Sequence, residues 1–148
     1  MAFLGTYDHS VDAKGRVSLP ARFRKELPEE VIIVPVNNPD LGHALFVFSD
    51  EAFKAWRADF FVGGPDGDDG YNKNNKRHLS LMRYLNANST QESVDAAGRI
   101  KLSAEQRARV GIEKDVKIIG GDDHIEIWDA STYVDKGEAD DPFAGFLV

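Results

Sequence analysis

Two arginines stand in the same chemical setting at two places in this 148-residue chain. Each ends the pattern Asp-x-x-Gly-Arg, which runs from Asp12 to Arg16 and again from Asp95 to Arg99. A guanidinium can pair with a phosphate, or with the N7 and O6 acceptors of guanine, through parallel hydrogen bonds. These residue types predict contact with nucleic acid. The alternative is that each arginine only pairs with its aspartate and stiffens a turn, and both roles can coexist in one side chain.

The two patterns belong to a longer internal repeat. Residues 10–21 and 93–104 align without a gap at an offset of 83 positions and are identical at eight of twelve. Residues 31–34 are echoed by 116–119, and residues 45–49 by 125–129. Because two repeats are too few for a solenoid, the sequence predicts a duplicated module with internal pseudo-symmetry.

In each copy an aspartate and a glycine are expected to support a tight turn between two short strands. Asp12 and Asp95 stand where a carboxylate can accept a hydrogen bond from the backbone two residues on. Gly15 and Gly98 can take the left-handed conformation that closes a type I turn with a bulge. Each arginine then emerges at the start of the return strand, beside its own aspartate.

The sequence predicts an α+β fold, rich in β structure, in which each copy runs strand, strand, short helix, strand, strand. The first copy is expected to have strands at 6–11, 16–19, 31–36 and 44–48 and a helix at 21–27. In the second copy the helix should end near Val110, with Gly111 as a left-handed cap, before strands at 116–119 and 124–128. Two more helices are expected at 50–61, capped by Ser49, and at 73–86.

The remaining groups do not suggest an enzyme or a metal site. The Gly- and Asp-rich stretch 63–70 departs from a calcium loop, since counting from Asp66 puts Tyr71 at the sixth position and Arg77 at the twelfth. The enzyme alternative is a hydrolase that uses Asp123 and His124, but no nucleophile or metal-ligand motif surrounds them. We therefore expect no catalytic residue, no metal, no cofactor, no small-molecule substrate and no membrane partner.

The charge pattern is compatible with DNA binding although the formal net charge is -7. Residues 121–148 hold eight acids and one base, whereas residues 1–120 hold 17 of each. The acidity therefore describes the C-terminal part, which we expect either to face away from DNA or to compete with it. The predicted DNA contacts are the cations on and beside the repeated turns: Lys14, Arg16, Arg22, Arg24, Arg99 and Lys101.

The order of these motifs resembles the MraZ family of bacterial regulators, which are built from two SpoVT-AbrB-like halves. The resemblance is carried by residues 3–7 (Phe-Leu-Gly-Thr-Tyr), by both Asp-x-x-Gly-Arg patterns, by residues 19–24 (Leu-Pro-Ala-Arg-Phe-Arg) and by residues 124–128. It implies a pseudo-symmetric double-psi, swapped-hairpin AbrB-type β-barrel with short flanking helices. The expected segments are a first half at 1–61, a loop and connecting helix at 62–87, a second half at 88–134 and an acidic tail at 135–148.

The resemblance also implies a function. It predicts a sequence-specific repressor of the division and cell-wall gene cluster, cytoplasmic and nucleoid-associated, acting on double-stranded DNA. A ring-shaped homo-oligomer would contact direct repeats upstream of its own operon, and the family's DNA-contacting element falls on Asp12, Arg16, Asp95 and Arg99. The alternative is an AbrB-fold, antitoxin-like protein that binds a toxin as well as DNA, for which the acidic tail after Asp135 is the motive.

Overall fold

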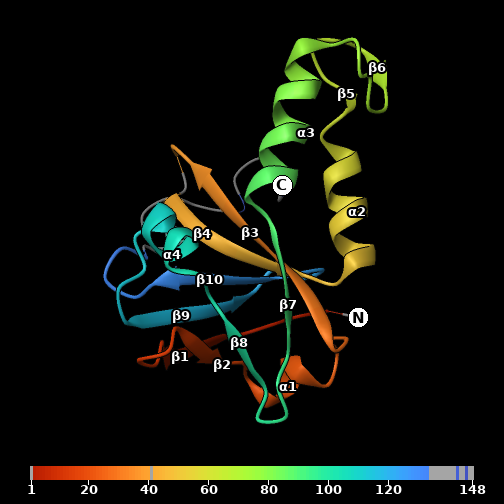
Figure 1. The fold of residues 1–148 in the computed structure, drawn as a ribbon. Coiled ribbons are helices and arrows are strands. Elements are labelled where there is room, and N and C mark those ends of the chain that lie inside the picture. The colour runs from red at the N-terminus through yellow and green to blue at the C-terminus, as the bar shows by residue number, and fades with distance from the viewer. Residues whose placement is uncertain (1, 41, 134–142, 144–145, 147–148) are drawn as a thin grey trace.

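The computed structural model of this chain has the β-rich α+β architecture expected from the sequence (Figure 1). It describes residues 2–40, 42–133, 143 and 146; most of the predicted acidic tail lies outside them. The main sheet has six strands in the order β1-β9-β10-β4-β3-β7. Their bounds are β1 Thr6–Ser10, β9 Asp115–Gly120, β10 Ile125–Asp129, β4 Gly42–Phe48, β3 Glu30–Asn38 and β7 Thr90–Ser93.

The two sequence copies exchange strands within this sheet. Strand β1 of the first copy pairs antiparallel with β9 of the second, and β7 of the second copy pairs antiparallel with β3 of the first. In the middle β4 pairs with β10, where Phe46 lies opposite Glu126. The swapped-hairpin arrangement is therefore confirmed, and the two copies share one sheet.

The return strands of the two hairpins form a separate two-stranded ribbon. Strand β2 (Arg16–Ser18) pairs antiparallel with β8 (Arg99–Lys101), and Val17 faces Ile100 at the centre. The predicted closed barrel is wrong in this respect, because the six-stranded sheet is open and has β1 and β7 as its edges. Each return strand is only three residues long and pairs with its counterpart. A single isolated bridge joins Val17 of β2 to Val11 next to β1, and no continuous ladder connects the ribbon to the edges of the sheet among the described residues.

The helices begin and end where local hydrogen bonds dictate. Their bounds are α1 Ala21–Arg24, α2 Asp50–Asp59, α3 Lys76–Asn88 and α4 Ala104–Val110. Ser49 Oγ accepts the Ala52 amide at the start of α2, as predicted. Gly111 ends α4 in the left-handed conformation with φ +73°, also as predicted.

Four helix boundaries differ from the prediction, since α2 also ends at Asp59 rather than residue 61 and α3 at Asn88 rather than residue 86. The other two have a clear local reason. Helix α1 ends at Arg24 rather than residue 27, because the amides of Glu26 and Leu27 bond three residues back rather than four, in a tightened turn ahead of Pro28. Helix α3 starts at Lys76 rather than residue 73, because the Asn75 side chain accepts the amides of residues 77 and 78 and caps the helix there.

The core ties the ribbon and α1 to the main sheet. Val17 and Ile100 are 0% and 1% exposed and pack in one cluster with the buried residues of the sheet. Phe23 of α1 meets the rings of Phe3 and Tyr7 edge-on, with ring centroids 5.4 and 5.3 Å apart. Burial of these apolar groups fixes the ribbon and α1, and with them the cations they carry.

Helices α2 and α3 form a hairpin that projects from the other side of the sheet from the ribbon (Figure 1). Its tip carries the short strands β5 (Val62–Gly63) and β6 (Asp68–Asp69). A second buried cluster, with Val34, Phe48, Phe53 and Leu85, joins the hairpin to β3 and β4. The longest described helix, α3, has 13 residues, and none in the described part of the chain has the length and apolarity to span a membrane.

Candidate nucleic-acid interface

The β2–β8 ribbon gathers the repeated arginines on one face. In the antiparallel register Arg16 lies opposite Lys101, and Arg99 lies opposite Ser18. Directly opposed residues share a face of a sheet and successive residues alternate between faces, so these four side chains lie on one side. Val17 and Ile100 occupy the other side and are buried. The outer face, here called the ribbon face, thus carries three cations and one hydroxyl: Arg16, Arg99, Lys101 and Ser18.

The first turn fixes Arg16 by three hydrogen bonds to Asp12. Asp12 Oδ1 accepts the amides of Lys14 and Arg16, each at 2.9 Å. Asp12 Oδ2 accepts Arg16 Nε, also at 2.9 Å. Gly15 has φ +79°, and its amide donates to the Asp12 carbonyl. One carboxylate therefore organises both the backbone of the turn and the rotamer of the arginine that leaves it.

The second turn repeats this geometry. Asp95 Oδ1 accepts the amides of Ala97 and Arg99, and Asp95 Oδ2 accepts Arg99 Nε, all at 2.9 Å. Gly98 has φ +76° and its amide donates to the Asp95 carbonyl. The identical pattern in two parts of the chain indicates that it follows from the local sequence.

The two aspartates are held in the charged form. The pKa of Asp12 lies below its ordinary value, chiefly because of the backbone N–H of Arg16 and against the effect of desolvation; Arg99 has the same effect on the pKa of Asp95. Each ion pair uses Nε, so the two Nη groups of the guanidinium are not needed to hold the turn. The Arg16 and Arg99 side chains are 30% and 33% exposed, which leaves them fixed but accessible.

The other predicted cations lie around the ribbon. Lys14 is exposed on the first turn, and Arg22 is exposed on α1. Arg24, also on α1, does something that sequence reasoning missed: its Nη1 donates to the carbonyl of Ala97 in the second turn at 2.7 Å. The structure therefore brings the predicted cations together around one ribbon. Arg24 follows the first turn in the sequence, but it contacts the second turn.

One basic residue near the first turn was absent from the predicted set. Arg107 on α4 is the counterpart of Arg24 at the repeat offset of 83, so the alignment could have pointed to it. Its Nε donates to the Leu102 carbonyl at 3.1 Å, and the Leu102 amide donates to the Gly15 carbonyl at 2.8 Å. The Leu19 amide donates to the Gly98 carbonyl in the same way, so each turn glycine holds the end of the opposite strand.

The Gly- and Asp-rich loop at 63–70 is held in place by a buried histidine, His78. Nε2 of His78 lies 3.5 Å from an Asp68 oxygen and 3.9 Å from an Asp66 oxygen, and the ligand-type atoms of the three residues lie within 4.8 Å of one another. His78 Nδ1, however, accepts the Asn72 amide at 3.0 Å, which puts the ring proton on Nε2. An Nε2–H that faces carboxylates is a donor rather than a metal ligand. This geometry therefore favours a structural role, in which His78 holds the loop in place.

His124 is likewise engaged on both ring nitrogens. Nδ1 lies 2.8 Å from Asp123 Oδ1 and Nε2 lies 2.9 Å from Glu126 Oε2, while the ring stacks on Phe46 with centroids 4.4 Å apart. Burial works to lower the pKa of His124, but the hydrogen bonds to Glu126 and Asp123 outweigh it and the pKa is raised. A histidine with both nitrogens bound to carboxylates has none left to act as a base, which disfavours the hydrolase alternative.

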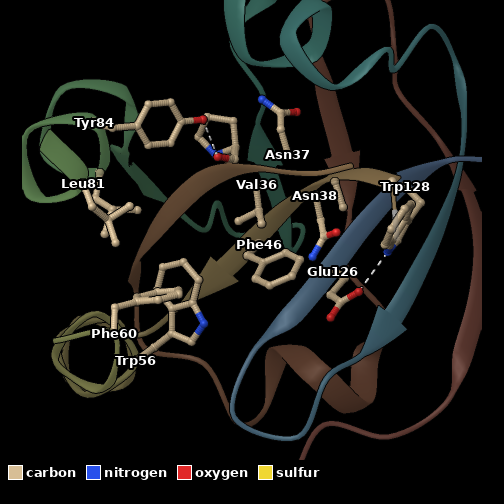
Figure 2. Close-up of a pocket in the computed structure, with 14 residues that line it drawn as sticks. Val36, Asn37, Asn38, Phe46, Trp56, Phe60, Leu81, Tyr84, Glu126 and Trp128 are labelled. Atoms are coloured by element: carbon tan, nitrogen blue, oxygen red, sulfur yellow. Dashed lines mark hydrogen bonds between the residues drawn. The ribbon is translucent and has the colours of Figure 1, made fainter. Parts of the chain in front are cut away.

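A groove of about 570 Å³ lies where the helical hairpin meets the sheet (Figure 2). Its walls are largely aromatic and aliphatic: Trp56, Phe60, Leu81 and Tyr84 from the helices, and Phe46 and Trp128 from the sheet. The Tyr84 hydroxyl donates to the Pro35 carbonyl at 2.8 Å, and Trp128 Nε1 donates to Glu126 Oε1 at 2.9 Å. The groove therefore offers mainly apolar contact, on a part of the molecule far from the ribbon face.

Comparison with known proteins agrees with the duplicated turns. The family model described as "MraZ protein, putative antitoxin-like" matches residues 2–60 and 85–141, which include both turns. The chain belongs to the MraZ family. Within this family it is 31% identical over 156 residues to "Transcriptional regulator MraZ" of Corynebacterium urealyticum, with 98% of this chain and 99% of the relative covered.

Further MraZ relatives give the same result. The identity is 34% over 139 residues with the protein of that name from Rhodococcus jostii, covering 92% of this chain and 89% of the relative. It is 35% over 131 residues with the one from Corynebacterium diphtheriae, covering 88% and 83%. The two segments matched by the MraZ model leave out residues 61–84, which hold β5, β6 and most of α3.

Proposed function

We propose that this protein is a DNA-binding regulator of transcription that contacts DNA through its ribbon face. The observation that carries the proposal is the exposed side of the β2–β8 ribbon, where Arg16, Arg99 and Lys101 lie together. A two-stranded ribbon fits the major groove, which is about 12 Å wide. The relatives named as transcriptional regulators support the regulatory role.

The contacts divide by chemistry. Arg16 and Arg99 keep their Nη groups for DNA while Nε stays on the aspartate, so each can pair with a guanine edge or bridge phosphates. Lys14 and Lys101 are exposed point charges suited to phosphate contact, which gives affinity through counterion release. Arg22, exposed on α1, is proposed as a flanking phosphate contact.

The finer biological role follows from the family resemblance. We propose a cytoplasmic, nucleoid-associated repressor of the division and cell-wall gene cluster that binds direct repeats upstream of its own operon. Repeated DNA sites suit an oligomer whose chains each make a weak contact through the ribbon face, because linked contacts raise the overall affinity.

The same proposal includes a ring of identical chains, in contact through the groove. Phe60 lines this apolar groove and is 51% exposed, so one surface offers both a hollow and a projecting apolar side chain. A head-to-tail contact of this kind closes into a ring and leaves the ribbon faces open, since hairpin and ribbon lie on opposite sides (Figure 1). Phe60→Glu should lower the mass measured by light scattering; an unchanged mass would count against this contact.

The test of DNA binding uses a duplex from the region upstream of the protein's own gene. Arg16→Ala should weaken binding about tenfold or more and reduce the slope of log affinity against log salt by about one. Lys54→Ala is the matched control, because Lys54 also pairs with an aspartate at i,i−4 but lies on α2, away from the ribbon. Equal affinities and slopes for wild type and Arg16→Ala would exclude the proposed role.

An antitoxin-like activity is the second candidate. The matched family is described as antitoxin-like, and the apolar rings of Phe143 and Phe146 near the C-terminus are 59% and 84% exposed. These exposed rings follow the acidic segment and would suit a protein partner. A small protein encoded next to this gene should then co-purify with the full chain and be lost when residues 135–148 are removed.

A further inference from the structure

The side chain of Arg24 starts in the first copy and ends in the second turn. Arg24 is the last residue of α1, and its Nη1 donates to the Ala97 carbonyl at 2.7 Å. The same side chain also covers Gly98, since a Cβ built on Gly98 would lie 1.9 Å from Arg24 Cδ and 2.6 Å from Nε. The contact therefore involves the distal part of the side chain, from Cδ to the guanidinium.

This contact holds the second turn from outside. Asp95 organises the turn from within, and it binds both the backbone amide and Nε of Arg99. Arg24 fixes the turn residue Ala97 between them. Any shift of the turn would carry Arg99 with it, so Arg24 is placed to control where Arg99 points.

The contact also supplies a charge that the second turn lacks. Ala97 occupies the position that corresponds to Lys14 in the first copy, so the second turn has no lysine of its own. The guanidinium of Arg24 lies at the Ala97 carbonyl and brings a positive charge to this turn. The second turn thus has two cations, Arg99 from its own copy and Arg24 from the other copy.

The counterpart of Arg24 makes a looser contact with the other turn. Arg107 donates to the Leu102 carbonyl within its own copy, and its Nη2 lies 3.1 Å from a Cβ built on Gly15. It therefore packs beside the first turn less closely than Arg24 packs on the second. The asymmetry matches the sequence difference, because the first turn carries its own lysine.

We propose that Arg24 is a positioning residue of the second turn, where it braces Arg99 and replaces the missing lysine charge. The protein then presents two cationic pairs, Lys14 with Arg16 and Arg24 with Arg99, and the second pair is assembled from both copies. The inference rests on the proposed DNA binding for its functional consequence. The brace itself can be measured without DNA.

The functional test is a pair of double-mutant cycles on the upstream duplex. Arg24→Ala should weaken binding about tenfold in the wild type and in Arg16→Ala, but about twofold or less in Arg99→Ala. Lys25→Ala removes the same charge from the adjacent residue and should show no such dependence on Arg99. Equal losses from Arg24→Ala in all three backgrounds would overturn the assignment to the second turn.

The structural test follows amide hydrogen exchange in the full chain without DNA. Arg24→Ala should speed exchange at Gly98 and at Leu19, whose amide is bound to the Gly98 carbonyl, and leave Leu102 at its wild-type rate. Unchanged exchange at Gly98 and Leu19 would overturn the brace. If exchange responds as stated but neither Arg16→Ala nor Arg99→Ala alters DNA affinity, the DNA-binding proposal fails while the brace is supported.

Discussion

The turn at residues 12–15 and the turn at residues 95–98 share one hydrogen-bond pattern but have different surroundings. The first carries Lys14 and is flanked by Arg107, which bonds within its own copy. The second carries Ala97 and is crossed by Arg24 from the other copy. Both copies therefore keep the hydrogen bonds that orient the arginine. The neighbouring cation differs, because the first turn has Lys14 and the second has Arg24 from the other copy.

The largest expected difference between the two turns is the loss of stability when the glycine of each turn, Gly98 or Gly15, is replaced by alanine. Gly98→Ala should lower the free energy of unfolding by about 2 kcal/mol, because it adds left-handed strain and displaces Arg24. Gly15→Ala meets only the end of Arg107 and the Leu102 carbonyl at 3.1 Å and should cost about 1 kcal/mol. Urea unfolding measures both values.

A third variant checks the origin of that difference. Removing Arg24 frees the space above Gly98, so Gly98→Ala combined with Arg24→Ala should cost less than the sum of the single changes. Equal costs for the two glycine variants, or strict additivity in this pair, would mean that the two turns are packed alike.

A smaller effect is expected from exchanging the residues that differ between the turns. Lys14→Ala should weaken DNA binding about threefold and lower the salt slope by about one, since it removes one phosphate contact. Ala97→Lys should do the reverse, and more strongly in Arg24→Ala, where the second turn has lost its added charge. Titrations at several salt concentrations measure both; salt slopes that do not change would show that these positions lie off the DNA.

The smallest difference between the turns should appear with pH. The folded-state pKa of Asp12 and of Asp95 is lowered, so each stabilises the fold fully above its unfolded value of about 3.8 and loses this contribution as the pH falls through the folded pKa. Asp12→Asn and Asp95→Asn should each flatten acid unfolding below about pH 4 by the same amount. Circular dichroism measures acid unfolding of both variants. A clear difference between their pH dependences would show that the two turns contribute unequally to stability despite their shared geometry.

Much of the local structure could be predicted because its causes are local. The caps at Ser49 and Gly111 follow from residue types next to each helix end. The predicted start of helix α3 lies three residues before the observed one, because the Asn75 side chain caps the helix. The functional role of each cation, and the segment boundaries 1–61, 62–87, 88–134 and 135–148, stay predictions.

Local sequence specifies the two turns, because each rests on hydrogen bonds between residues at most four apart, such as Asp12 with Arg16. It also determined the strands of the repeated segments and the caps at Ser49 and Gly111, whose patterns are read within a few residues. Three features depend on tertiary structure. Val17 pairs with Ile100, and the main sheet is open rather than closed into a barrel. Arg24 contacts Ala97, 73 residues away in the sequence. Such pairings depend on which apolar faces are buried against each other across the whole chain, and local sequence does not specify that choice.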